Sequence, residues 1–201
     1  MILVGSRTSP YVRKVRVLLA ERQLAHQFLE ESAWTKETTV PRYNPLNKVP
    51  ALALDDGESI YDSAVIAEYL DALSGGHFIP ADPRARARVR CLEALGDGIA
   101  DAGITAFLER KREVSRQDNA WIARQMDKVT AGIGAVGAAL GDRPHLGGER
   151  MDLADVACAC ALFWLEFRMP ELRWRETNPR LGAWAQRLES RDSFQATRPP
   201  A

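Results

Sequence analysis

The chain of 201 residues is long enough for one large domain or two small ones, and either can bury a substantial core. Hydrophobic residues make up 46% and charged residues 27%, which is typical of a soluble globular protein. Lys plus Arg and Asp plus Glu number 27 each, so the net charge gives no reason to expect nucleic acid or an anionic membrane as a partner. No apolar run reaches the roughly 18 residues of a membrane span.

The sulfur and imidazole side chains form no recognisable site. The chain has three cysteines and three histidines, namely Cys91, Cys158, Cys160, His26, His77 and His145. The cysteines are too few and too irregularly placed for a disulfide framework, so we expect buried reduced thiols and a cytoplasmic location. No histidine stands at metal-ligand spacing from a cysteine or carboxylate, so we expect no metal. The opening MILVGSRTSP is too briefly apolar for a secretory signal.

The first 73 residues predict a mixed α/β order, β-α-β followed by β-β-α. The expected elements are a strand at 2–5, a helix at 11–23, a strand at 26–30, a hairpin at 51–61 around an Asp-Gly turn, and a helix at 62–73. The stretch SGGHFIPADP then holds two glycines and two prolines, which favours a linker.

The rest of the chain predicts helices only. They are expected at 84–112, 117–140, 152–167 and about 180–189. We therefore predict an α/β domain at 1–78, a linker at 79–83 and an all-helical domain at 84–201, whose most apolar helix, 152–167, is central. Asp152 and Asp155 have the spacing of a capping box for that helix. The glycines of EALGDGIADAG indicate close helix approach, because glycine within a helix is otherwise unfavourable.

The segment NPLNKVPAL, residues 44–52, contains a Val-Pro step before a strand. If the Val49–Pro50 peptide is cis, the backbone N–H and C=O of Val49 face outward and can pair with an extended, peptide-like ligand. The alternative is an ordinary turn before an edge strand. The segment alone does not decide between them.

Asp62 and Ser63 stand at the start of a predicted helix in YDSAVIAEYL. Ser63 fits a structural N-cap. The N–H groups of a helix start also bind a carboxylate, and Asp62 can accept from an ammonium group. Together the pair suits the zwitterionic head of an α-amino acid.

The stretch SRTSPYVRKVRVLL places Ser9 directly before Pro10. Thioredoxin-like sequences put the first cysteine of a C-P-Y-C motif at this position, whereas this chain has Ser9 and Val12 at the two cysteine positions. Dithiol redox chemistry is therefore excluded here. A plain N-cap before a proline at the first helical position explains Ser9 equally well.

These three motifs, in this order and followed by a helical half containing DLADVACA, resemble the cytosolic glutathione S-transferases, specifically the bacterial serine-type proteins related to the theta and zeta branches. The resemblance extends to the ending SRDSFQATRPP. It implies a thioredoxin-like domain that binds glutathione as co-substrate, and a helical domain that supplies the pocket for a small apolar electrophile. It also implies a cytoplasmic homodimer of the kind that serves detoxification, with no metal, nucleic acid or membrane partner.

The resemblance also implies residue roles. Val49, followed by a cis Pro50, would pair with the cysteinyl backbone of glutathione. Asp62 and Ser63 would hold the γ-glutamyl group, and Lys48 would reach the glycyl carboxylate. Further glycyl contacts are expected in the variable loop that holds Trp34 and Lys36, and Asp101 would contact the γ-glutamyl group across a dimer interface.

Ser9 would donate its hydroxyl to the glutathione sulfur. A free thiol has a pKa of about 8.5. A hydroxyl donor and a helix N-terminus that together stabilise the thiolate by about 1–3 kcal/mol would lower this pKa and make the thiolate a major species at neutral pH. Thr8 is the alternative donor, and Ser6 is close by. Tyr11 falls within the helix and is expected to pack.

Two other readings of the function stay open. One is a glutathione-dependent isomerase or dehalogenase, which would differ in the pocket of the helical domain. The other is a non-catalytic interaction or stress module on the same fold.

Overall fold

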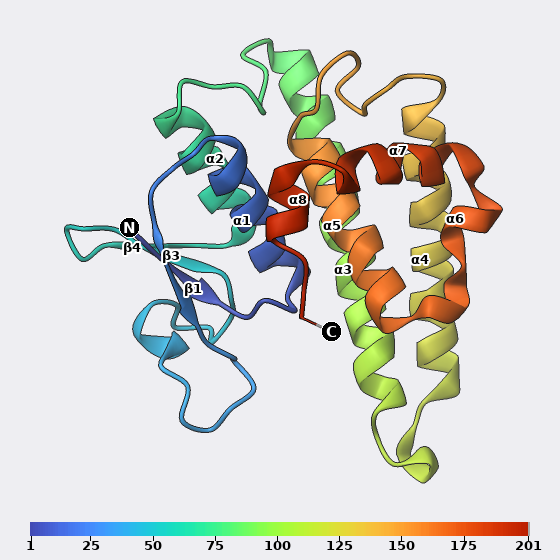
Figure 1. Ribbon diagram of the computed structural model, residues 1–201. Coiled ribbons are helices and arrows are strands. Elements are labelled where there is room, and N and C mark those ends of the chain that lie inside the picture. The colour runs from blue at the N-terminus through green and yellow to red at the C-terminus, as the bar shows by residue number, and fades with distance from the viewer. Residues whose placement is uncertain (201) are drawn as a thin grey trace. The chain divides into compact units, whose positions relative to one another are not determined.

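The computed structural model describes residues 1–200 (Figure 1). The chain forms two compact units. Residues 1–81 together with 189–200 form the N-terminal unit, and residues 82–188 form the helical unit. The sequence prediction placed all of 84–201 in the helical domain, so the structure differs from it in the position of the last segment.

The N-terminal unit contains a four-stranded sheet of order β2-β1-β3-β4. The strands are β1 (Ile2–Gly5), β2 (Gln27–Glu30), β3 (Ala51–Ala53) and β4 (Ser59–Tyr61). β2 is parallel to β1, whereas β3 is antiparallel to both β1 and β4. The helices are α1 (Pro10–Glu21), α2 (Ser63–Leu73) and the short 3-10 helix η1 (Val40–Arg42). The predicted strands, hairpin and two helices are confirmed.

Both faces of the sheet are covered, because consecutive residues of its central strands, which point to opposite faces, are apolar and largely buried. Val4 and Ala51 are fully buried in a cluster with Val40 of η1. α1 packs against α2, which in turn contacts β3 and β4. Gly5 lets the end of β1 approach α1 closely, since a Cβ at this position would lie 2.5 Å from a methyl group of Val12. The sheet therefore holds the start of α1 directly beyond the end of β1.

The C-terminal segment includes α8 (Asp192–Ala196), which packs on α1 (Figure 1). Buried Arg13 of α1 donates to the carbonyl of Phe194 at 3.2 Å. Arg191 forms two hydrogen bonds with Glu21, of 2.8 and 2.7 Å. Burial opposes ionisation of Glu21, but the bonds from Arg191 lower the pKa of this carboxyl. These long-range contacts are the physical reason why residues 189–200 belong to the N-terminal unit.

The helical unit contains the predicted helices and one more. They are α3 (Pro83–Arg110), α4 (Asn119–Leu140), α5 (Leu153–Arg168), α6 (Trp174–Thr177) and α7 (Pro179–Glu189), with short 3-10 helices η2 (Val114–Arg116) and η3 (Pro170–Leu172). α6 and α8 were not predicted, because four or five residues carry no detectable periodicity. Every residue from 153 to 165 is buried, so α5 is central as expected.

The glycines of α3 allow it to pack closely on α5, as the sequence indicated. A Cβ on Gly96 would lie 2.9 Å from backbone atoms of Ala157 and Cys158, and one on Gly103 would lie 2.6 Å from Leu165. Gly98 instead faces open space. Cys158 and Cys160 are buried, but the expectation of a buried thiol is wrong for Cys91, which is exposed. Among the helices of residues 1–200, none is long and apolar enough to cross a membrane.

The predicted capping box at the start of α5 is confirmed. Oδ1 of Asp152 accepts from the amides of Ala154 and Asp155, and Oδ2 of Asp155 accepts from the amide of Asp152. Asp155 is fully buried and also accepts from the amides of Leu146 and Gly147, at 2.8 and 3.2 Å, and from the indole of Trp184 at 2.8 Å.

The pKa values of the two carboxyls in the capping box are shifted in opposite directions from the ordinary value of an aspartate. Burial and the negative charge of Asp155 raise the pKa of Asp152 to about 7. Burial opposes ionisation of Asp155, yet its N–H donors and His145, whose Nδ1 lies 3.7 Å from Oδ1, lower its pKa. Asp155 is therefore the carboxylate, and Asp152 holds a proton through acidic pH.

Asp155→Asn and Asp152→Asn form a matched pair. Each carboxylate oxygen of Asp155 accepts from two N–H groups, and Asp155→Asn replaces one of these oxygens with an NH2 group that can only donate. We therefore expect this substitution to lower the free energy of unfolding by about 3 kcal/mol. Asp152→Asn keeps an accepting oxygen for the helix amides and should change stability at neutral pH by less than about 1 kcal/mol. Urea denaturation measures both, and equal losses would contradict the assignment.

The same pair predicts a pH dependence. Because the pKa of Asp152 is raised, the folded protein binds a proton that the unfolded chain has released, so stability falls as pH rises from about 4 to 7. Asp155 acts in the opposite sense, since its lowered pKa makes stability fall as pH drops below about 4. The measurement is the free energy of unfolding from urea denaturation at a series of pH values. In Asp152→Asn the fall in stability between about pH 4 and 7 should disappear.

Gly96→Ala and Gly98→Ala test the helix packing. Gly96→Ala pushes a methyl group into backbone atoms of α5 and should cost about 1–3 kcal/mol of stability. Gly98→Ala meets no neighbour and should raise stability by up to about 1 kcal/mol through helix propensity. Thermal unfolding separates the two outcomes, and a stabilising Gly96→Ala would refute the close approach.

Candidate functional site at the strand ends

The register of the sheet brings four chain segments together along one edge. Ala51 of β3 lies opposite both Val4 of β1 and Tyr61 of β4, and Gly5 lies opposite Glu30 of β2. Consequently the loop after β1, the loop before β3, the junction after β4 and the loop after β2 all emerge at this edge. All predicted residues of the N-terminal unit lie on these four segments.

Ser9 is the N-cap of α1, and Pro10 is its first residue. The Ser9 hydroxyl accepts from the amide of Val12 at 3.3 Å. Within residues 1–200 its proton has no acceptor, so this O–H remains available to a ligand. The hydroxyls of Ser6 and Thr8 lie 3.1 Å apart and are paired with each other.

The Val49–Pro50 peptide is cis, as one of the two sequence readings required. Val49 is half-buried and packs on the cluster around Val4, whereas Pro50 is buried. Within residues 1–200 neither the amide nor the carbonyl of Val49 has a hydrogen-bond partner. An N–H and C=O pair without a partner beside a sheet can pair with an extended peptide as another strand would.

Asn44 fixes the loop in front of Val49, a role that the sequence reading missed. It is 3% exposed, its Nδ2 donates to the carbonyl of Lys48 at 2.9 Å, and its Oδ1 accepts from the amide of Leu46 at 3.0 Å. The only signal in the sequence was an asparagine before proline, which is common in turns. Lys48 itself is exposed at the edge.

The junction after β4 corrects one expectation. The N-cap of α2 is Asp62, not Ser63, and Oδ1 of Asp62 accepts from the amide of Ala64 at 2.8 Å. Ser63 is the first helical residue and is buried. Asp62 has φ 68° and ψ 130°, a conformation that costs a residue with a side chain on the order of 1–3 kcal/mol. The surrounding structure therefore holds Asp62 in a strained position at the edge.

The loop after β2 is tied at its base and open at its tip. Glu31 accepts hydrogen bonds from the hydroxyls of Thr38 and Thr39, at 3.1 and 2.6 Å. The bond from Thr39 is the main reason why the pKa of Glu31 is lowered. Trp34 is 79% exposed, and Lys36 is also exposed.

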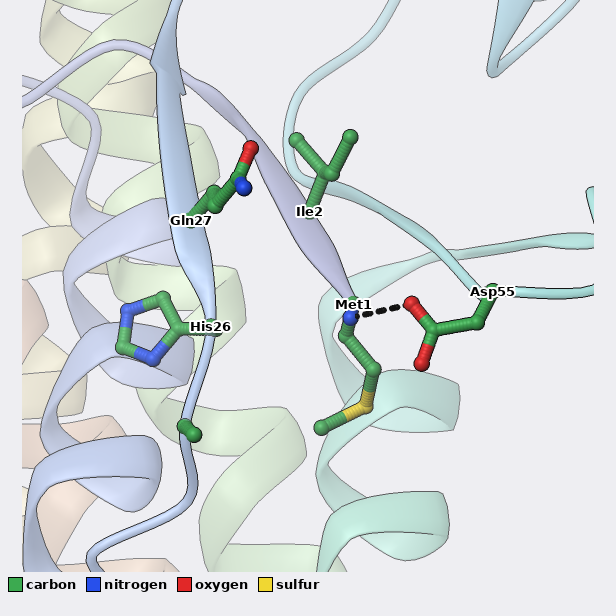
Figure 2. A pocket seen from close by; sticks show the side chains of 6 residues that line it. Met1, Ile2, His26, Gln27 and Asp55 are labelled. Carbon is green, nitrogen blue, oxygen red and sulfur yellow. Dashed lines mark hydrogen bonds and ion pairs between the residues drawn. The ribbon is translucent and has the colours of Figure 1, made fainter.

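The remaining features are a second hollow on the N-terminal unit, Asp101 on the helical unit, and the question of a metal site. A shallow hollow at the opposite edge, where β1 begins, is lined by Met1, Ile2, Ala25, His26, Gln27 and Asp55 (Figure 2). It holds none of the predicted residues, and the amino group of Met1 is paired with Asp55 across it at 2.7 Å. Asp101 is exposed on α3 of the helical unit. The part of the chain that the structure describes contains no His, Cys, Asp and Glu cluster suited to a metal.

A thioredoxin-like α/β unit without redox cysteines, followed by an all-helical unit, defines the class of this protein. Two family models match it, the glutathione S-transferase N-terminal domain over residues 8–73 and the C-terminal domain over residues 119–187. The chain belongs to the glutathione S-transferase family.

Relatives match over the full length. The chain is 38% identical to the Escherichia coli GST-like protein YibF, covering 100% of this chain and 99% of the relative. It is similar to a Methylobacillus flagellatus glutathione S-transferase with glutathione bound (40% identity, TM-score 0.96, 99% of each chain). It is also similar to a Methylobacterium radiotolerans enzyme in complex with glutathione sulfonate (39% identity, TM-score 0.95, 100% of this chain and 95% of the other).

Two substitutions of Asp62 test the strain at the edge. Glycine adopts a positive φ without a Cβ penalty, whereas alanine keeps the penalty and also loses the cap. We therefore expect Asp62→Gly to be more stable than Asp62→Ala by about 1 kcal/mol or more, the reverse of the usual order at helical positions. Urea denaturation compares them, and a more stable alanine variant would show that the backbone relaxes.

Proposed function

We propose that the strand-end edge binds glutathione and that the protein joins the sulfur of glutathione to a small apolar electrophile. The observation that carries this proposal is the N–H and C=O pair of Val49, which has no hydrogen-bond partner in the described part of the chain. The pair lies on an edge flanked by the starts of α1 and α2. That pair would bind the cysteinyl backbone. The start of α2, with Ser63 and Asp62, would take the γ-glutamyl carboxylate and ammonium. Lys48 would reach the glycyl carboxylate.

Ser9 would stabilise the thiolate. Its O–H has no acceptor among residues 1–200, and the N-terminus of α1 adds a partial positive charge next to it. Thr8 is less suited, since its hydroxyl is already paired with that of Ser6. No general base is needed, because the bound thiol has already released its proton to solvent. The thiolate sulfur then forms the new bond to the electrophilic carbon while the bond from that carbon to the leaving group breaks, and the leaving group takes the bonding electrons.

The relatives named above support glutathione as the co-substrate. A Pseudomonas fluorescens family member, 37% identical with a TM-score of 0.86, was solved with S-(propanoic acid)-glutathione, a conjugate at sulfur. The electrophile pocket would come from the helical unit, and a homodimer would place Asp101 of one copy near the γ-glutamyl group of the other. A cytoplasmic detoxifying role fits these assignments.

The test is the thiol pKa of bound glutathione, followed by the ultraviolet absorbance of the thiolate. Ser9→Ala should leave glutathione bound and raise that pKa toward its ordinary value of about 8.5, with a proportional loss of conjugation rate at neutral pH. Ser9→Thr keeps both hydroxyl and cap and should retain a lowered pKa.

Thr8→Val is the matched control, because it removes the neighbouring hydroxyl. An unchanged pKa in Ser9→Ala together with a raised one in Thr8→Val would move the role to Thr8. If the wild-type protein binds no glutathione, the proposed function fails.

A further inference from the structure

The charged side chains where α3 and α5 end are paired with two exceptions. The segments 107–116 and 163–176 hold five glutamates, and each forms an ion pair with a different arginine. The pairs are Arg110–Glu171, Arg112–Glu109, Arg116–Glu113, Arg173–Glu176 and Arg175–Glu166. Lys111 and Arg168 are the two cations that remain in these segments. Among residues 1–200, neither side chain has an ion pair or a hydrogen bond.

These two cations converge on one aromatic ring. Nζ of Lys111 lies 4.6 Å from the centre of the Phe107 ring, and Cζ of Arg168 lies 5.7 Å from the same centre. The electron-rich face of a ring attracts each cation separately. The two like charges repel each other, however, and an anion between them would turn that repulsion into two attractions. The ends of α3 and α5, which pack against each other along the helical unit (Figure 1), therefore carry a local excess of positive charge.

Neighbouring aromatic side chains fix the ring and the guanidinium group. Phe107 meets buried Trp164 edge-on, with ring centres 5.7 Å apart and ring planes at 84°. Arg168 also lies over Phe167, at 4.3 Å from the centre of that ring. A guanidinium group that is held by rings rather than by a carboxylate keeps its N–H donors for a planar oxyanion, which it can bind through two parallel bonds. Arg168 is therefore positioned before any ligand arrives.

The helix ends explain the sign of these charges but not their arrangement. Lys111 is the C-cap of α3, and Arg168 is the last residue of α5. Positive charge is favourable at both places because the C-terminus of a helix carries a partial negative charge. That interaction does not require a shared ring, and it uses none of the side-chain N–H donors. The donors of both cations therefore remain available to a ligand.

We propose that Lys111 and Arg168 form a binding site for the carboxylate of an aromatic ligand. Arg168 donates two N–H groups to the carboxylate oxygens, and Lys111 supplies the second positive charge. The half-buried rings of Phe107 and Phe167 contact the aromatic body of the ligand. The site lies wholly within the helical unit, and it goes beyond the proposed function, which assigns no anionic ligand to this unit.

The experiment titrates the full-length protein, without glutathione, with naphthalene-2-carboxylate and with the uncharged amide of the same shape. Calorimetry measures both affinities. The carboxylate should bind at least about tenfold more tightly than the amide, which lacks the charge and the second accepting oxygen. Arg168→Gln and Lys111→Gln should each weaken carboxylate binding about tenfold and leave amide binding unchanged. Arg168→Lys should retain only part of the affinity, because lysine keeps the charge and loses the planar pair of donors.

Lys128→Gln is the matched control. Lys128 is also an exposed lysine over an aromatic ring, at 5.9 Å from the centre of the Trp121 ring, but among residues 1–200 no second cation lies over that ring. This variant should bind the carboxylate like wild type, and a loss equal to that of Lys111→Gln would overturn the site.

Three further results would overturn the proposal. They are equal affinity of wild type for the carboxylate and the amide, no binding of the carboxylate, and full carboxylate binding by both Arg168→Gln and Lys111→Gln. Inorganic phosphate that binds as tightly as naphthalene-2-carboxylate would refute the aromatic part of the ligand. No arm of the experiment uses glutathione, so the proposed function stands or fails separately.

Discussion

The pairing of β3 with both neighbours is the constraint on which the candidate site depends. With Ala51 opposite Val4 and Tyr61, the chain before β3, after β1 and after β4 must meet at one edge. A register slip of one residue would turn Leu52 to the face where Ala51 and Ala53 now pack, and its larger side chain would not fit the space that an alanine fills. Burial of the sheet on both faces thus fixes the register, and the register in turn fixes the site.

In each unit, buried polar side chains fix the conformation of the loops by hydrogen bonding to their backbone groups. Asp155 receives four N–H groups from three segments of the helical unit. Asp71 of α2 accepts from the amides of residues 77–79, so the stretch expected to be a plain linker is pinned, and Phe78 is buried. Asn44 does the same in front of Val49. Each group is satisfied, so its burial orders the loop without an unpaired polar atom.

Much of this architecture is local and hence legible in the sequence. Hydrophobic periodicity predicted the strands and long helices, and residue types at helix starts predicted Ser9 and the Asp152–Asp155 box. Three features were beyond such reasoning because distant residues decide them. The cap at Asp62 depends on where β4 ends, residues 189–200 are placed by Arg13 and Glu21, and the exposure of Trp34 depends on what surrounds its loop.

Capping and thiolate stabilisation at Ser9 are compatible functions of one hydroxyl. A serine side chain offers two lone pairs and one proton. A lone pair of the Ser9 oxygen accepts from the Val12 amide, which holds the side chain in place without using its proton. That acceptance also polarises the O–H toward whatever acceptor lies in front of it. A residue that caps α1 in the free protein therefore keeps its proton for the proposed donation to a sulfur, and the helix that it caps supplies additional positive potential at the same point.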